Sequence, residues 1–509
     1  MNGAQALLDL YSNLGVEVCF ANPGTTEMAL VHALESTPSI RPFLGMTEGV
    51  VAGAADGYGR MSDVPAISIL HLGPGFANSI SNLHNARRAK TPMITIVGDH
   101  ATWHAEADAP LASDLYGLAH AASDWVGTIA TPRSVLVMGM EAYRQAMEGQ
   151  VATLIFPTDM QEAEASSAPV GLSSVPYHPV AIVSESVMAA LRRPKSALFL
   201  GGGALRGENL RLASAIAIKT ESRLISETFS ARMERGAGVP STERLPYFPE
   251  QAMACLEDLD TLVLVGAKAP VAFFGYEGME SNVVPDWVAV HSLSTERDPS
   301  LALQALSAQV GVDSADINNV EPANGASESV PDGSLTPKTI GVTIAATQAP
   351  GTIMIDEAAT SGLPYFHSSA DAPSFDHLML TGGSLGFGLP AAIGVAIACP
   401  DRPIVAFVAD GSSLYTMQSL WTMQRYGLNV TVIVAANEQY RILRVEADRA
   451  EIPMGPVVSA MTDISGVSWT DLAKGLGVLA VQVATCPELA AAMVHRRASK
   501  GPYLIEAKL

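Results

Sequence analysis

Uninterrupted apolar runs alternate with longer amphipathic stretches over the first third of the chain. VEVCFANPG (16–24), PAISILHLGPG (65–75), PMITIVGD (92–99) and ATLIFPTD (152–159) each contain such a run and end in a turn. AQALLDLYSNLG (4–15) and EGVVAGAADGYGRM (48–61) have helical periodicity. Apolar runs without alternation are typical of strands buried on both faces of a parallel sheet. The pattern therefore predicts a βαβ series over residues 1–165.

The same alternation begins again twice. SALFLGGGAL (196–205), SRLISET (222–228), TLVLVGAK (261–268) and WVAVHSL (287–293) predict a central α/β domain over 180–311. TIMIDEA (352–358), PIVAFVAD (403–410), VTVIVAANE (430–438) and PYLIEAKL (502–509) predict a third over 339–509. A Ser/Pro-rich stretch (163–179) and a polar linker (312–338) separate these parts. We expect an α/β protein of three domains, each a mainly parallel sheet flanked by helices.

Charge and cysteine content indicate which classes of binding partner and which cellular compartment to expect. The 509 residues carry a net charge of −21, which opposes binding to nucleic acid or to anionic membranes. Four scattered cysteines without metal-ligand spacing indicate reduced thiols in a cytosolic protein. The N-terminus lacks the basic and long apolar regions of a signal peptide, and no apolar stretch is long enough to span a bilayer. We expect a cytoplasmic protein.

Two polar side chains follow two of the predicted strands of the third domain. Asp410 ends PIVAFVAD and Asn437 ends VTVIVAAN. Ligands of parallel sheets bind beyond the carboxyl ends of the strands, and carboxylate and amide oxygens suit Mg²⁺. Gly411 would let a phosphate approach the backbone, and Ser412 and Ser413 would begin a helix whose N-terminus favours an anion. Two ordinary turns remain the alternative interpretation.

The spacing of ADG (409–411) and AN (436–437) resembles the metal motif of thiamin-diphosphate enzymes, a GDG followed by NN. Alanine replaces the first glycine and the first asparagine of that motif. The resemblance implies that Asp410, Asn437 and the backbone carbonyl of Gln439 bind Mg²⁺. It also implies that Gly411, Ser412, Ser413 and Tyr440 lie against the cofactor.

Two further stretches of the third domain resemble the same superfamily. TGGSLGFGLPAAIGVAIACPDRPIVAFVADG (381–411) is similar to its benzoylformate decarboxylase branch. The resemblance implies that Gly383, Ser384 and Leu385 contact the cofactor, with Leu385 as the apolar wedge that bends it. IDEAATSG (355–362) resembles a loop that contacts the diphosphate, and Thr360 is the matching residue.

A carboxylate of the first domain completes the expected cofactor site. TEGVVAGAADGYGRMS (47–62) resembles the family stretch that carries the activating glutamate. Alone, Glu48 would be an ordinary carboxylate at a helix N-terminus. The resemblance implies that Glu48 bonds the cofactor pyrimidine and that the cofactor itself then supplies the base. In the family this glutamate and the diphosphate site come from different subunits, so a dimer is the minimum and a tetramer is usual.

The expected reaction pocket rests on weaker similarities. ANPGTTEM (21–28) and LHLGPGFANS (70–79) resemble decarboxylase loops in which Thr25 would bind substrate and His71 would relay protons. His100, Ile442 and Glu446 are further pocket candidates. A histidine at a strand end is more often structural, and helix charges are usually solvated.

Two departures from the family leave the reaction open. GAKAPVAFFGYEG (266–278) lacks the second catalytic histidine of the decarboxylases, and the signatures of acetolactate synthases are incomplete. LFLGGGALRGENL (198–210) only partly fits a dinucleotide loop, so FAD is not expected.

The resemblance implies a thiamin-diphosphate- and Mg²⁺-dependent enzyme that decarboxylates or ligates a small 2-oxo acid. The alternatives are a lyase of 2-hydroxy ketones or 2-hydroxyacyl thioesters, and a non-catalytic cofactor-binding paralogue.

Overall fold

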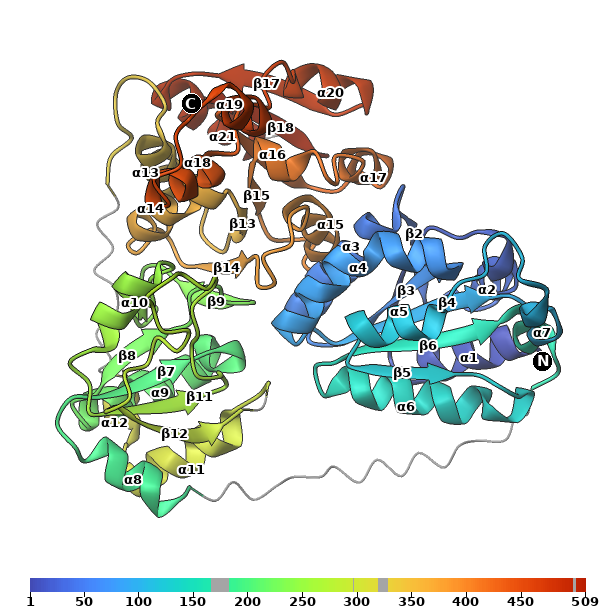
Figure 1. The fold of residues 1–509 in the computed structure, drawn as a ribbon, viewed down its shortest axis with the longest axis horizontal. Helices are drawn as coiled ribbons and strands as arrows, with labels where there is room; N and C mark the ends of the chain where they lie inside the picture. The colour runs from blue at the N-terminus through green and yellow to red at the C-terminus, as the bar shows by residue number, and fades with distance from the viewer. Residues whose placement is uncertain (166–182, 296, 319–327, 498–499) are drawn as a thin grey trace. The chain divides into compact units, whose positions relative to one another are not determined.

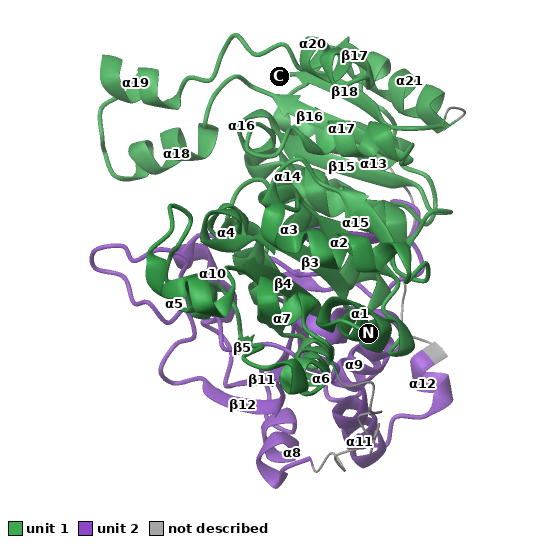
Figure 2. Ribbon diagram, turned by 90° about the vertical axis from the view of Figure 1, so that its right-hand side faces the viewer, with its two compact units in different colours: residues 1–173, 328–368, 380–509 green, residues 174–327, 369–379 purple. Residues whose placement is uncertain are grey.

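The computed structural model describes residues 1–165, 183–295, 297–318, 328–497 and 500–509. Most of the Ser/Pro-rich stretch and part of the predicted linker therefore lie outside the described residues. The chain forms two compact units, one of residues 1–173, 328–368 and 380–509, and one of residues 174–327 and 369–379 (Figure 2).

The N-terminal part of unit 1 is a parallel sheet covered by helices (Figure 1). Its strands, in spatial order, are β2 (Arg41–Leu44), β1 (Val18–Ala21), β3 (Ala66–His71), β4 (Met93–Asp99), β6 (Val151–Pro157) and β5 (Trp125–Thr128). Its helices are α1 (Gly3–Asn13), η1 (Thr25–Glu27), α2 (Met28–Glu35), α3 (Glu48–Ser62), α4 (Leu72–Ala89), η2 (Thr102–Ala107), α5 (Leu115–Ala122), η3 (Pro132–Ser134), α6 (Val135–Met147) and α7 (Thr158–Glu162).

The C-terminal part of unit 1 repeats this architecture. Its parallel strands, in spatial order, are β17 (Leu479–Val483), β18 (Tyr503–Lys508), β16 (Val430–Ala436), β15 (Ile404–Ala409) and β13 (Ile353–Glu357). Its helices are α13 (Pro337–Thr347), η5 (Ala359–Ser361), α14 (Gly362–Ser368), α15 (Gly388–Ala398), α16 (Asp410–Ser413), α17 (Ser419–Arg425), α18 (Arg441–Arg449), α19 (Pro456–Thr462), α20 (Trp469–Gly475) and α21 (Cys486–Arg497).

Unit 2 contains a third parallel sheet, and two further strands of this unit, outside that sheet, form an antiparallel pair. The sheet has the strand order β10 (Glu243–Arg244), β8 (Arg223–Ser226), β7 (Ser196–Leu200), β11 (Thr261–Val265) and β12 (Ala289–Ser294), and β9 (Met233–Arg235) pairs with β14 (Phe375–Met379). The helices are α8 (Glu185–Leu191), η4 (Gly202–Leu205), α9 (Gly207–Lys219), α10 (Pro249–Leu256), α11 (Ser300–Val310) and α12 (Ser314–Asn318).

The three parallel sheets confirm the predicted fold class, and all twelve predicted strands are present. Two local expectations were wrong. The segment after β3 is the first turn of α4 and not a loop. The helix expected after Asp410 is interrupted between α16 and α17, where Thr416 N–H bonds the carbonyl three residues earlier and its hydroxyl bonds Gly386 O.

Helices α3 and α15 join the two parts of unit 1 by close backbone packing (Figures 1 and 2). A Cβ atom at Gly57 would lie 2.1 Å from the carbonyl oxygen of Ala391. A Cβ atom at Gly394 would lie 1.9 Å from the carbonyl oxygen of Ala54. Only glycine permits this close approach of α3 and α15.

No helix among the described residues combines the length and the apolar character that crossing a bilayer requires.

Candidate cofactor site and reaction pocket

The sheet register brings Asp410 and Asn437 to the same edge. Ala409, the last residue of β15, is paired with Ala435 of the parallel strand β16. Asp410 is 4% exposed, and its Oδ2 accepts the N–H of Glu438 at 2.6 Å, while Oδ1 accepts the N–H of Gly411 at 2.8 Å. Burial raises the pKa of Asp410, and these backbone N–H groups oppose that rise.

The loop after β16 presents further oxygens beside this carboxylate. Asn437 Oδ1 accepts the N–H of Gln439 at 3.0 Å, so the amide oxygen is held in place. The carbonyl of Gln439 accepts the N–H of Arg441 at 2.9 Å and retains a second lone pair. A carboxylate, an amide oxygen and a carbonyl form a hard donor set that fits Mg²⁺.

Gly411 and the ring of Tyr440 pack directly against each other next to Asp410. A Cβ atom at Gly411 would lie 2.5 Å from Cε1 of Tyr440, so the ring packs directly on the glycine. Burial, followed by the neighbouring Tyr415 and Asp410, raises the pKa of Tyr440. The hydroxyls of Ser412 and Ser413 both donate to Ala409 O, at 3.1 and 2.7 Å, and thereby fix the turn after β15. Tyr440 thus lies beside the carboxylate of the expected cation site.

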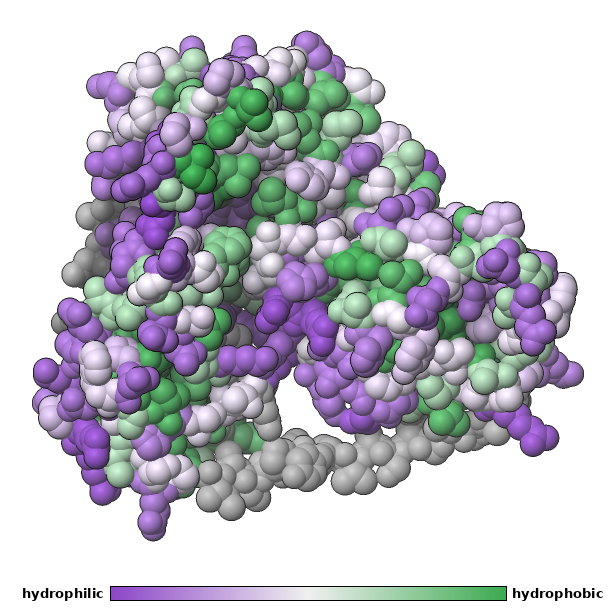
Figure 3. Space-filling model, viewed as in Figure 1, coloured by the Kyte–Doolittle hydropathy of each residue, from purple (hydrophilic) through white to green (hydrophobic). Residues whose placement is uncertain are grey.

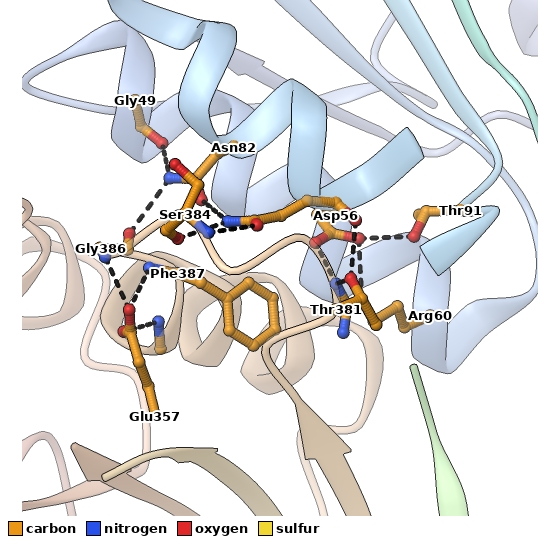
Figure 4. A network of polar contacts seen from close by, with 12 residues as sticks. Gly49, Asp56, Arg60, Asn82, Thr91, Glu357, Thr381, Ser384, Gly386 and Phe387 are labelled. Atoms are coloured by element: carbon orange, nitrogen blue, oxygen red, sulfur yellow. Dashed lines mark hydrogen bonds and ion pairs between the residues drawn. The ribbon is translucent and has the colours of Figure 1, made fainter. Parts of the chain in front are cut away.

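The loop 381–388 is held from two sides (Figure 4). Asn85 of α4 donates to Ser384 O at 2.8 Å, and its Oδ1 accepts the N–H of Ser384 at 3.2 Å. Asn82 donates to Gly386 O at 3.1 Å. From the other side, Glu357 at the end of β13 accepts the N–H groups of Gly386, Phe387 and Gly388 at 2.7, 3.2 and 2.6 Å. Gly383 and Leu385, the residues expected to contact the cofactor, therefore belong to a fixed loop.

Glu357 was not anticipated from the sequence. It is 4% exposed, and burial raises its pKa to about 7 although three backbone N–H groups favour the ionised form. Thr360 lies in η5, after Ala359 with a φ of 49°, and so follows the end of β13 closely. The contact between the Thr360 hydroxyl and a diphosphate stays a prediction.

Glu48 is the first residue of α3, with Thr47 as the N-cap. Its carboxylate is held by two amide side chains, because Asn22 donates to Oε1 at 3.1 Å and Asn78 donates to Oε2 at 3.2 Å. Glu48 is 9% exposed. Both asparagines lie in stretches with family resemblance, ANPGTTEM and LHLGPGFANS, but no sequence pattern singled them out.

A second carboxylate lies beside His71. Glu27 is fully buried, and its Oε2 lies 2.8 Å from His71 Nδ1 and accepts the N–H of Gly24 at 2.7 Å. Thr26 donates to Glu27 Oε1 at 2.5 Å, and its hydroxyl lies 3.0 Å from His71 Nδ1. The expected substrate residue Thr25 is exposed. The histidine is therefore oriented by Glu27, a residue that the sequence pattern did not single out.

A glycine brings Glu48 and His71 near each other. A Cβ atom at Gly75 would lie 3.1 Å from Glu48 Oε1 and 3.3 Å from His71 Cβ. His71 is also the register partner of Gly98 in β4, so His100 follows at the same edge of the sheet, with its ring 5.6 Å from that of His104. These groups gather at the carboxyl ends of β1, β3 and β4.

The remaining pocket candidates lie on α18. Ile442 and Glu446 are half-buried, and Glu446 lies 3.8 Å from Arg449 of the same helix. Arg444 donates to the hydroxyl of Thr462 on α19 at 3.0 Å. This contact fixes α18 against α19.

Comparison with known proteins extends over the whole chain. The thiamine pyrophosphate enzyme N-terminal TPP binding domain matches residues 1–121, and the C-terminal TPP binding domain matches residues 365–507. A Mycobacterium tuberculosis protein, IlvX, described provisionally as an acetolactate synthase large subunit, is 42% identical and is covered over 98% of its length by 99% of this chain. A Pseudomonas aeruginosa benzoylformate decarboxylase is 26% identical over 97% of this chain and 96% of its own.

A solved structure supports the same architecture. The thiamine diphosphate-dependent 4-hydroxybenzoylformate decarboxylase of Rhodococcus jostii RHA1 superimposes with a TM-score of 0.83 at 22% identity, over 99% of this chain and 98% of that one. This likeness concerns the fold. Taken with the two matching domains and the 42% identical relative, it leads to one conclusion: the chain belongs to the thiamine pyrophosphate enzyme family, in the group of acetolactate synthases and benzoylformate decarboxylases.

Proposed function

We propose that this protein is a thiamin-diphosphate- and Mg²⁺-dependent enzyme that acts on a 2-oxo acid, by decarboxylation, by carboligation or by both. The cofactor supplies a nucleophilic carbon and an electron sink for such reactions. The observation that carries the proposal is Glu48, a buried carboxylate whose oxygens are held by Asn22 and Asn78. A structural carboxylate at a helix start would not need two side-chain amides to orient it.

Glu48 would bind the protonated ring nitrogen of the cofactor pyrimidine. The side-chain amides of Asn22 and Asn78 donate hydrogen bonds to Glu48 and bring no positive charge to it. The residue therefore can hold a proton at the ring nitrogen in a fixed direction, which is the contact that activates the cofactor in this family.

Asp410, Asn437 and the Gln439 carbonyl would hold Mg²⁺ and, through it, the diphosphate. Burial disfavours the charged form of Asp410, and a divalent cation at that carboxylate would offset this cost. The backbone N–H of Glu438 orients the carboxylate beforehand. Loop 381–388, held by Glu357 and Asn85, would present Ser384 and Leu385 to the cofactor.

His71 would exchange protons with substrate-derived groups in the pocket. Glu27 lies at Nδ1, so the other ring nitrogen is directed away from Glu27. His71 keeps 22% of its side chain exposed, which leaves the ring accessible. Thr25 and His100 are proposed as substrate contacts at the same edge.

We also propose a homo-oligomer of at least two chains, and a tetramer in the family's usual form, in the cytoplasm. Apolar side chains reach the surface over the C-terminal part of unit 1 (Figure 3), and α18 and α19 extend away from the sheet in Figure 2. Exposed residues there include Leu443, Ile452, Val457 and Met461, of which the last two are 74% exposed. A second chain would bury them.

FAD is not part of the proposal. In unit 2 the carboxylate of Glu227 accepts the N–H of Gly202 at 3.3 Å, in the glycine-rich loop where a nucleotide phosphate would bind. A carboxylate at this position would repel a phosphate.

The test is to incubate the purified protein with Mg²⁺, thiamin diphosphate and a panel of 2-oxo acids, with CO₂ and products followed by NMR. Pyruvate, 2-oxobutyrate, benzoylformate and branched-chain acids form the panel. CO₂ with an aldehyde identifies a decarboxylase, and CO₂ with an acyloin or acetohydroxy acid identifies a synthase. Absence of CO₂ from all acids, with cofactor bound, would overturn the proposal in favour of a lyase of hydroxy ketones or thioesters.

Glu48→Gln is the decisive variant, and the same change at Glu35, whose side chain is 77% exposed, is its matched control. We expect Glu48→Gln to lose about 100-fold or more in kcat, because an interaction of several kcal/mol is removed from the activation step. Glu35→Gln should retain full activity. A Glu48→Gln rate within a few-fold of the wild type would refute the role of Glu48.

A further inference from the structure

A cavity of about 340 Å³ lies in unit 1 at the amino ends of β13, β15 and β16. It is lined by the ends of α13 and α21, by the segment 400–405 that leads into β15, and by the start of β16. Asp410 and Asn437 lie at the opposite, carboxyl ends of β15 and β16. The six residues of β15 separate the two places by roughly 20 Å at about 3.3 Å per residue. The cavity is therefore distinct from the candidate cofactor site.

Three guanidinium groups line this cavity. Among the described residues, Arg402, Arg496 and Arg497 contribute to its wall together with one carboxylate, Asp401. The chain as a whole has a net charge of −21 with only 30 basic residues among 509, so a local excess of positive charge stands out against the rest of the molecule. Such an excess in a concave place favours a ligand with negative charge.

Each guanidinium is fixed by a bond to the protein framework. Arg402 Nε donates to Gly351 O at 2.9 Å, and Arg496 Nη2 donates to Asn429 Oδ1 at 3.0 Å. Arg497 Nη2 donates to the carbonyl of Thr347. Anchored guanidiniums lose little side-chain entropy when they bind, and their planar donors match carboxylate and phosphate oxygens.

Burial makes the charge at Arg496 costly. The residue is 6% exposed, and burial lowers its pKa. An anion in the cavity would offset this cost, because opposite charges attract strongly where water is scarce. The wall also includes apolar groups of Ile404, Val405 and Met493, so the cavity suits an organic body that carries the anionic groups.

We propose that this cavity is a binding site for a small anion that carries carboxylate or phosphate groups, separate from the thiamin diphosphate site. Arg402, Arg496 and Arg497 bind the anionic groups. The volume sets the size at that of a small metabolite and excludes a dinucleotide. The proposal does not depend on which reaction the enzyme catalyses.

The test measures binding to the holoenzyme, saturated with thiamin diphosphate and Mg²⁺ so that the cofactor site is filled. Citrate and inorganic phosphate are titrated separately by calorimetry, each against sodium chloride at the same ionic strength. Because citrate chelates Mg²⁺, Mg²⁺ is kept in excess and the heat of the same titration into Mg²⁺ and cofactor without protein is subtracted. Saturable binding of citrate alone identifies a polycarboxylate site, and saturable binding of phosphate identifies a phosphate site. Either result supports the proposal, and the absence of saturable binding of both probes up to 10 mM, roughly the weakest affinity a specific site would show, overturns it.

Variants connect the binding to the cavity. Arg402→Gln and Arg497→Gln should each weaken the affinity by about tenfold or more, since a charge-assisted bond is lost. Arg88→Gln, a matched change on the exposed face of α4, should leave it unchanged. Because Arg497 is exposed, we expect its variant to fold. The test can therefore be made with Arg497→Gln even if Arg402→Gln, at a more buried position, does not fold. Equal binding by Arg497→Gln and Arg88→Gln would overturn the assignment.

Discussion

Removal of the buried carboxylate at Glu357 gives a prediction with a defined sign and size. The pKa of Glu357 is about 7 in the folded chain, against an ordinary value of 4.5. The folded state therefore keeps the proton up to about pH 7, whereas the unfolded chain releases it near pH 4.5. Between these values the folded state binds more protons, so the stability of unit 1 falls as the pH rises.

The size follows from the difference between 7 and 4.5. At about 1.4 kcal/mol per pKa unit, the free energy of unfolding should fall by about 3 kcal/mol between pH 5 and pH 8 because of this one group. Glu357→Gln removes the titration. Its amide oxygen can keep the bonds from Gly386 and Phe387 but its NH₂ group cannot accept the N–H of Gly388, which costs about 1–3 kcal/mol at every pH.

The assay is urea unfolding of the wild type and of Glu357→Gln at several pH values, followed by tryptophan fluorescence. We expect the variant to be less stable at pH 5 and to match or exceed the wild type at pH 8. Hydrogen exchange of the backbone amides of residues 386–388 should be faster in the variant than in the wild type at pH 5, and equal or slower at pH 8. Glu451→Gln, an exposed change in the same unit, is the control and should follow the wild type. Parallel stability curves for wild type and Glu357→Gln would refute the reasoning.

Three other changes test the packing and the pocket. Asp56→Asn should lower the free energy of unfolding by about 3–5 kcal/mol, because the buried Arg60 guanidinium 2.6 Å away loses its counter-charge, and urea unfolding measures this. Gly394→Ala should cost about 1–3 kcal/mol through the clash with Ala54 O, whereas Gly475→Ala, where a Cβ meets nothing within 4 Å, should be neutral in the same assay. Glu27→Gln should reduce kcat about tenfold or more at unchanged cofactor affinity, because His71 loses a charged partner, and an unchanged kcat would show that Glu27 is structural only.

The approach of Asp410 and Asn437 was predictable because it follows from the fold class. Parallel strands end at one edge, so two polar residues that each follow an apolar run must come together once both runs pair. The pairing of Ala409 with Ala435 fulfils this condition for Asp410 and Asn437. The start of α3 at Glu48 was equally readable, since a short strand, a cap and an apolar helix stand in sequence there.

The hydrogen bonds of Glu357 and the start of α4 could not be predicted from the sequence. The hydrogen-bond partners of Glu357 are the backbone N–H groups of residues 386–388. Since nearly every residue type has a backbone N–H group, the sequence does not reveal these bonds. The start of α4 resembled a loop because LGPG contains two glycines and a proline. Proline is tolerated in the first turn of a helix, and Gly75 is needed there because a side chain would meet Glu48 and His71. Tertiary contact, and not helix propensity, selected these residues.

Two buried carboxylates of the candidate site, Glu48 and Asp410, accept hydrogen bonds from uncharged donors and not from lysine or arginine. Glu48 is held by two amide side chains, and Asp410 is held by backbone N–H groups. These neutral donors orient a carboxylate without cancelling its charge, whereas a lysine or arginine would neutralise it, as Arg60 does for Asp56 in the packing core. Asp410 therefore remains able to bind a divalent cation, and Glu48 remains able to bind a protonated ring. The contrast with the Asp56–Arg60 pair distinguishes a carboxylate that is paired within the fold from the two carboxylates that we propose to bind the cofactor and its cation.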